Sequence, residues 1–163
     1  GTGSGCIAIT LKKKNPIWEV IGIDKSVNTL STAESNAQMH KLSMRFLKQD
    51  IFETPTIKTK FDIIVSNPPY VLESDKDQMS EMVLKHEPEQ ALFVPNTDPL
   101  LFYRRILELA PSILNPGGKI YFEIHEKKGS EMKALCLASN MSNVRVMQDM
   151  QGKERMMSMQ FTQ

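Results

Sequence analysis

The chain has 163 residues, of which 40% are hydrophobic, enough for one core of ordinary size. We therefore expect a single domain over residues 1–163. Twenty Lys and Arg against 19 Asp and Glu leave a formal charge of +1, which argues against a surface that neutralises many phosphates. The chain has only two cysteines, no apolar run of the roughly 18 residues that span a bilayer, and no signal-peptide pattern. These features favour a cytoplasmic protein.

Apolar runs alternate with helical patterns along the chain, which is typical of an α/β domain. Six apolar, β-branched runs predict strands at Glu19–Asp24, Met44–Lys48, Phe61–Ser66, Lys119–Ile124, Val144–Asp149 and Arg155–Phe161. Helices are predicted at Ser4–Lys14, Ser26–Lys41, Asp98–Leu114 and Lys127–Ser139, with Ser26 as an N-cap and Asn115-Pro116-Gly117-Gly118 ending the third. The stretch between Tyr70 and Pro99 has little periodicity, so we expect an irregular substrate loop there.

A glycine-rich loop, Gly1-Thr2-Gly3-Ser4-Gly5, precedes the first predicted helix. Small residues let the backbone approach a ligand closely, and the amides at a helix N-terminus receive negative groups such as the carboxylate of a methionine moiety. The loop therefore predicts a cofactor site. A plain flexible turn is the alternative, because such loops are common.

Two acids follow predicted strands. Asp24 ends the strand after the glycine loop, where α/β cofactor domains place an acid on ribose hydroxyls; the alternative is a surface residue that caps the next helix. Asp50, followed by Ile51 and Phe52, is predicted to accept from an adenine amino group while the apolar pair packs on the ring. Its alternative is a simple turn residue. These spacings alone do not separate a nicotinamide dinucleotide from S-adenosylmethionine.

A second motif, Asn67-Pro68-Pro69-Tyr70, follows a predicted strand at the edge where open α/β sheets bind ligands. An amide or exocyclic amino nitrogen is a poor nucleophile, because its lone pair is delocalised. The Asn67 oxygen and the Pro68 carbonyl can accept both of its protons and orient it toward a sulfonium methyl group. The prolines fix φ and remove competing donors, and Tyr70 offers a flat face. The alternative is a strand that ends in a Pro-Pro turn.

The glycine loop, Asp24, Asp50 and Asn67–Tyr70 together resemble class I methyltransferases that act on planar nitrogens. A second block narrows the resemblance to release-factor glutamine methyltransferases of the HemK/PrmC type: His86–Leu92, Phe102–Ile106, Asn115–Gly118 and Phe122–Ile124. The resemblance implies a Rossmann-like sheet with helices on both faces and S-adenosylmethionine as the cofactor. It also implies methyl transfer to the glutamine of a Gly-Gly-Gln loop in bacterial or organellar peptide chain release factors. We expect a monomer.

The sequence departs from the family at His86, Pro99 and His125, where the family usually has an aromatic residue, glycine and glycine. In the family, a hydrophobic strand and a helical domain precede the glycine loop. Neither is present before Gly1, so we expect the first, central strand to be missing and the isolated chain to bind its cofactor weakly.

Two other functions stay open from the sequence. An enzyme that methylates an amino group of a nucleic-acid base needs the same acceptors at Asn67 and Pro68. A non-catalytic cofactor-binding module has no use for them. Between Glu73 and Gln90, six acidic residues face two lysines, a balance of −4 that would repel phosphates and favours a protein substrate. The three histidines are far apart in sequence, so no metal site is predicted.

Overall fold

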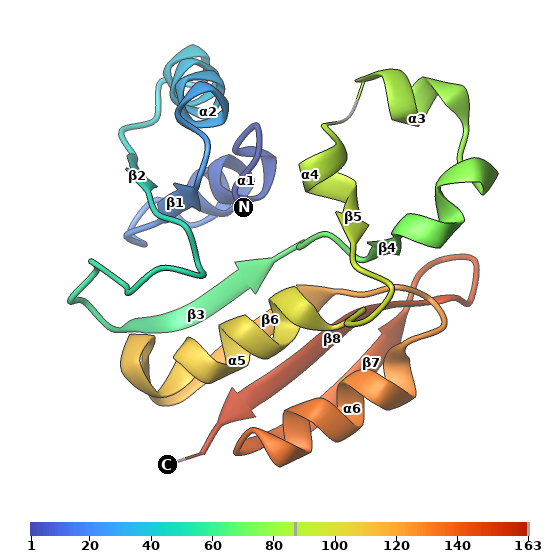
Figure 1. The fold of residues 1–163 in the computed structure, drawn as a ribbon. Helices are drawn as coiled ribbons and strands as arrows, with labels where there is room; N and C mark the ends of the chain where they lie inside the picture. Colours follow the sequence, from blue (N-terminus) through green and yellow to red (C-terminus); the bar gives the residue numbers. More distant parts are fainter. Residues whose placement is uncertain (87, 163) are drawn as a thin grey trace. The chain divides into compact units, whose positions relative to one another are not determined.

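The computed structural model describes residues 1–86 and 88–162, which divide into two compact units, Gly1–Thr56 and Ile57–Gln163 (Figure 1). Each unit contains parallel strands joined through helices. This arrangement confirms the predicted α/β class, whereas the expectation of a single domain stays a prediction. No described helix has the length and apolar character needed to cross a membrane.

The first unit is built around one parallel strand pair. Its elements in order are α1 (Cys6–Lys14), β1 (Ile21–Asp24), α2 (Val27–Met39) and β2 (Arg45–Lys48). Parallel strands need a crossover connection, and α2 supplies it between β1 and β2. The helix begins at the predicted N-cap: the Ser26 hydroxyl oxygen accepts a hydrogen bond from the Thr29 amide at 3.2 Å. Its inner face buries Leu30, Ala33 and Ala37.

The second unit contains a mixed four-stranded sheet of β3 (Phe61–Ser66), β6 (Leu114–Glu123), β8 (Glu154–Phe161) and β7 (Met141–Gln148), in that order. β3 and β6 are parallel, whereas β6 with β8 and β8 with β7 are antiparallel. The helices α5 (Leu101–Ile113) and α6 (Gly129–Ala138) lie on one face of this sheet (Figure 1). The long predicted strands are thus present, although β6 begins earlier than expected.

The core of the second unit lies between this sheet and its two helices. Tyr103 of α5 and Phe122 of β6 are almost fully buried, and their rings meet edge to face with centroids 5.1 Å apart. Farther along, Cys136 of α6 places its sulfur 3.3 Å from the Met159 sulfur of β8. Aromatic and sulfur contacts of this kind fix the helices on the sheet.

The segment Asn115–Gly118 follows the end of the third predicted helix, as expected, because α5 ends at Ile113, one residue before the predicted Leu114. Its strand character was not predicted: the segment forms the irregular start of β6. The register shifts from Phe61 opposite Leu114 to Ile63 opposite Lys119, so the four residues form a bulge. The Asn115 side chain donates to the Asp62 carboxylate at 2.8 Å and ties the bulge to β3.

The stretch from Tyr70 to Pro99 also differs from its prediction, because short elements occupy most of it. They are β4 (Val71–Leu72), the 3-10 helix η1 (Glu73–Gln78), α3 (Glu81–His86), α4 (Glu89–Leu92) and β5 (Phe93–Val94). β4 and β5 form a small parallel pair of their own. Elements of two to six residues are too short to produce a clear periodicity in sequence.

The pairing of β1 and β3 does not test the expected missing strand. Within residues 1–86 and 88–162, β1 pairs with β2 only and β3 with β6 only. The absence of a first strand between them stays a prediction, because the positions of the two units relative to each other are not determined.

Replacing Phe122 by Ala should destabilise the second unit, because it removes a buried ring that packs against Tyr103. We expect the free energy of unfolding to fall by about 3–5 kcal/mol. Urea denaturation followed by far-ultraviolet circular dichroism measures this change. The control is Met150→Ala in the exposed β7–β8 turn, which should change stability by less than about 0.5 kcal/mol. Equal effects of the two substitutions would show that Phe122 is not a core residue.

Candidate functional site

The glycine loop is held against the end of β1 in the first unit. The Thr2 amide donates to the Ile23 carbonyl at 2.7 Å, and the Gly3 amide donates to the Asp24 carboxylate at 3.1 Å. Gly3 and Gly5 have φ values of +57° and +83°, which favour glycine. The loop therefore has a defined conformation and is more than a flexible turn.

The Asp24 carboxylate fixes both this loop and the start of α2. One oxygen accepts from the Gly3 amide and the other from the Ser26 amide at 3.0 Å, and the residue is 9% exposed. The alternative of a helix-capping acid is therefore supported in part, although Asp24 is buried. A carboxylate oxygen accepts more than one hydrogen bond, so the contact with a ribose hydroxyl stays a prediction.

Asp50 lies in a turn after β2, where its carboxylate accepts from the Phe52 amide at 3.0 Å. This contact matches the alternative of a turn residue. Ile51 is half-buried and Phe52 is exposed. The predicted contacts of Asp50 and Ile51 with an adenine ring stay predictions. The predicted cofactor contact of Ser4 in the glycine loop also stays a prediction; its carbonyl accepts from the Asn36 side chain at 2.9 Å.

The Asn67-Pro68-Pro69-Tyr70 segment follows the carboxyl end of β3 in the second unit. Pro68 is buried, Pro69 and Tyr70 are half-buried, and Asn67 is exposed. Among the described residues, no hydrogen-bonding partner is found for the Asn67 side chain, so its oxygen is available to a substrate proton. This segment and the glycine loop belong to different units, so their expected proximity stays a prediction.

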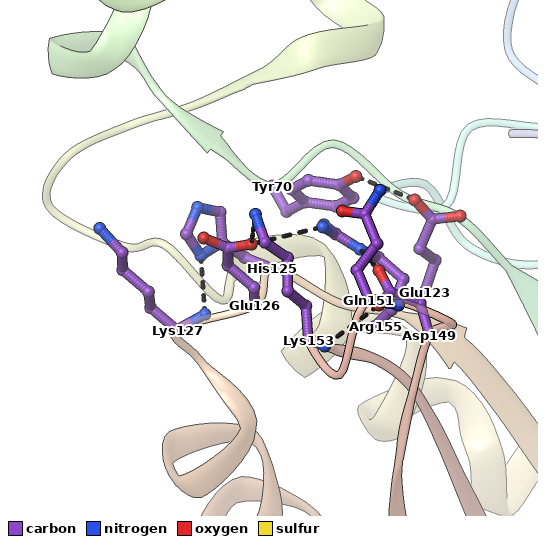
Figure 2. A network of polar contacts seen from close by, with 9 residues as sticks. All are labelled: Tyr70, Glu123, His125, Glu126, Lys127, Asp149, Gln151, Lys153 and Arg155. Carbon is purple, nitrogen blue, oxygen red and sulfur yellow. Dashed lines mark hydrogen bonds and ion pairs between the residues drawn. The ribbon is translucent and has the colours of Figure 1, made fainter.

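Tyr70 is anchored by a neighbouring strand. Its hydroxyl donates to the Glu123 carboxylate at 2.9 Å, and Figure 2 shows this contact above the β7–β8 turn. Burial, together with the Glu123 carboxylate, raises the pKa of Tyr70 to about 12, so the hydroxyl remains a donor at neutral pH. The His125 ring meets the Tyr70 ring edge-on, with centroids 6.1 Å apart.

A group of ion pairs surrounds this contact. Arg155 lies 3.5 Å from both the Glu126 and the Asp149 carboxylates, and Lys153 pairs with Glu126 at 2.8 Å. The hydrogen bond from Lys153 lowers the pKa of Glu126, whereas burial lowers the pKa of His125. The sequence analysis missed these contacts, because the β7–β8 turn is far along the chain from Tyr70.

The acidic stretch after the motif is only partly neutralised by its own lysines. Lys76 pairs with Glu89, and Lys85 pairs with Glu81 at 3.4 Å. Lys76 also lies over the Phe93 ring, 5.6 Å from its centroid. One of the six acids, Glu87, lies outside the described residues. Glu73, Asp75 and Asp77 have no lysine partner among the described residues, so the stretch keeps an excess of acids.

The fold and the sequence match a known class of enzymes. A family model described as "Methyltransferase domain" matches residues 1–163, and the chain belongs to this family. Its fold is shared with a solved methyltransferase from Pyrococcus furiosus, with a TM-score of 0.72 and 18% identity over 100% of this chain and 73% of that one. A magnesium protoporphyrin IX methyltransferase from Synechocystis PCC 6803, solved with bound SAM, has a TM-score of 0.60 at 14% identity over 99% and 67%.

The sequence is similar to curated proteins with a more specific name. A release factor glutamine methyltransferase from Bacteroides thetaiotaomicron is 47% identical over 97% of this chain and 57% of its own length. The chain therefore spans little more than half of this relative. The resemblance predicted from the motifs is confirmed.

Replacing Asp24 by Asn should loosen the glycine loop, because the amide keeps one acceptor oxygen and loses the other. Hydrogen bonds to charged groups contribute about 1.5–3 kcal/mol, so we expect the first unit to lose about that much stability. The only tryptophan, Trp18, lies in this unit, and its fluorescence during urea denaturation reports the change. Glu34→Gln, an exposed acid on α2, is the control and should have little effect. An unchanged midpoint for Asp24→Asn would contradict the role assigned to its carboxylate.

Proposed function

We propose that the chain is the catalytic part of an enzyme that transfers a methyl group from S-adenosylmethionine to the side-chain amide nitrogen of a glutamine in peptide chain release factors. The observation that carries the proposal is the exposed Asn67 side chain, without a described partner, beside the buried Pro68 at the end of β3. We place the protein in the cytoplasm, as a monomer.

The chemistry follows from the two acceptors. An amide nitrogen has two protons and a delocalised lone pair, and it reacts only when it is held in a productive orientation. The Asn67 oxygen accepts one proton and the Pro68 carbonyl accepts the other. Both contacts strengthen as the nitrogen gains positive character, so they stabilise the transition state more than the bound substrate.

The proposed cofactor contacts of the first unit begin with the glycine loop. Gly1, Thr2, Gly3, Ser4 and Gly5 form a loop that two left-handed glycines and the Asp24 carboxylate hold in place. We propose that this loop receives the methionine carboxylate, that Asp24 contacts the ribose, and that Asp50 and Ile51 contact the adenine. We also propose that Asn67 contacts the cofactor. S-adenosylmethionine supplies an electrophilic methyl group, so the protein has only to orient the nitrogen.

The choice of a protein substrate is supported by charge and by the relatives. The acidic stretch Glu73–Gln90 follows the substrate motif and repels phosphates, which disfavours DNA and RNA. The curated relative from Bacteroides thetaiotaomicron is named for the glutamine of release factors.

A direct comparison of substrates tests this proposal. The assay uses a version of the chain extended at its amino end by the strand that precedes the glycine loop in the family. We expect it to methylate a release factor and to leave duplex DNA and RNA unmodified, because of the negative stretch beside Asn67. Mass spectrometry of the digested protein locates the methyl group on glutamine. Methyl incorporation into nucleic acid that decreases steeply with salt would favour the alternative enzyme class.

Asn67→Ala should abolish most of the turnover. Loss of one oriented transition-state contact costs about 2.7–4 kcal/mol, or roughly a hundred- to a thousandfold in kcat. The Kd of the cofactor should change much less, because most of its proposed contacts lie elsewhere. Steady-state kinetics and calorimetry on the extended version measure both quantities.

Asn67→Asp is the matched control for this substitution. A carboxylate still accepts the substrate proton but lacks the NH2 donor of asparagine, so we expect partial activity. Circular dichroism confirms that both variants fold. Near-normal kcat in a folded Asn67→Ala protein would reduce the segment to a structural turn.

A further inference from the structure

Glu123, the last residue of β6, accepts hydrogen bonds from two tyrosines. Its side-chain carboxylate accepts from the Tyr70 hydroxyl at 2.9 Å, and its backbone carbonyl accepts from the Tyr103 hydroxyl at 2.8 Å. The first hydrogen bond connects Glu123 to the proposed substrate segment, Asn67–Tyr70, whereas the second connects it to the core of the second unit. The residue therefore connects Tyr70 to the most buried part of the second unit.

The position of Glu123 is fixed by its surroundings. Its neighbours Phe122 and Ile124 are buried, and the Ile124 amide donates to the Arg155 carbonyl at 2.9 Å. Tyr103, 1% exposed, holds the Glu123 backbone from the other side. The Glu123 side chain therefore starts from a fixed point on the sheet, and its contact with the Tyr70 hydroxyl orients the carboxylate at the other end.

The charged groups around Tyr70 and Glu123 are paired with one another. Figure 2 shows His125, Arg155, Lys153, Glu126 and Asp149 in this group. Arg155 is engaged by Glu126 and Asp149, and the His125 Nδ1 atom accepts from the Lys127 amide at 3.1 Å. Arg155 is therefore shared with two other acids, and among the described residues the partner of the Glu123 carboxylate is the Tyr70 hydroxyl.

We infer that Glu123 is a positioning residue for the proposed methyl transfer: its carboxylate fixes the Tyr70 ring and thereby the Asn67 and Pro68 acceptors in the same segment. The inference rests on the proposed function. Only Pro68 and Pro69 separate Asn67 from Tyr70, and proline φ angles are nearly fixed. Anchoring the tyrosine end of the segment consequently restricts the asparagine end as well.

The kinetic test compares four variants of the protein used for the methyl-transfer assay. Glu123→Ala removes the acceptor, and we expect kcat to fall about tenfold while KM for S-adenosylmethionine stays within about twofold. Glu123→Gln keeps an acceptor oxygen and should restore most of kcat. Tyr70→Phe should behave like Glu123→Ala, and the double variant Glu123→Ala with Tyr70→Phe should be no slower than either. Multiplied losses in the double variant, or a Gln variant as slow as Ala, would overturn the inference.

The matched control is Tyr103→Phe, which removes the hydrogen bond to the backbone of the same residue. It lowers stability but leaves the Glu123 carboxylate on Tyr70, so kcat should stay within about twofold in the folded protein. A tenfold loss of kcat in this control, equal to that of Glu123→Ala, would overturn the inference by showing that general loosening of β6 is sufficient.

A spectroscopic test is independent of turnover and uses the 163-residue chain itself. The chain has three tyrosines, so labelling with 13Cζ-tyrosine gives three signals, and Glu123→Ala should shift that of Tyr70 much more than those of Tyr103 and Tyr121. Absence of methyl transfer by the unsubstituted protein would defeat the proposed function alone. An unchanged Tyr70 signal would defeat the inference, whatever the enzyme does.

Discussion

The parallel pairing of β3 with β6 is the constraint on which the candidate substrate site depends. Parallel strands end at the same edge of a sheet, and the register sets Ser66 opposite Phe122. The next residues along the two strands are Asn67 and Glu123. The pairing therefore brings the start of the substrate segment beside the carboxylate that holds its last residue, although 56 positions separate Asn67 from Glu123 in sequence.

Buried apolar contacts and polar contacts contribute differently at this edge of the sheet. The apolar contact of Tyr103 with Phe122 stabilises the sheet, and it does so without specifying any substrate. The hydrogen bond from Tyr70 to the Glu123 carboxylate also stabilises the fold, by about 1.5–3 kcal/mol for a bond to a charged group, but it acts on one short segment. Its main contribution is to orient the Tyr70 side chain. The packed core and this oriented hydrogen bond together hold the loop residues after β3 in a defined arrangement.

Sequence reasoning identified the elements whose signals are local. The long strands, the Ser26 N-cap and the two motifs follow from periodicity, capping chemistry and spacing. The bulge at Asn115–Gly118 was missed because glycine and proline punctuate helices and bulged strands alike. The role of Glu123 was missed because it depends on strand pairing. The sequence itself shows only an acid between the apolar residues Phe122 and Ile124, in a block that resembles the methyltransferase family.

The most direct test of the account is to observe the substrate amide itself. A Gly-Gly-Gln peptide labelled with 15N in the glutamine side chain is bound to the extended protein with the demethylated cofactor present. The account predicts that both side-chain N–H protons shift downfield in the nuclear magnetic resonance spectrum, because the Asn67 oxygen and the Pro68 carbonyl each accept one. If saturating peptide left both signals unchanged, the glutamine amide would not be held by these acceptors and the central claim would be contradicted.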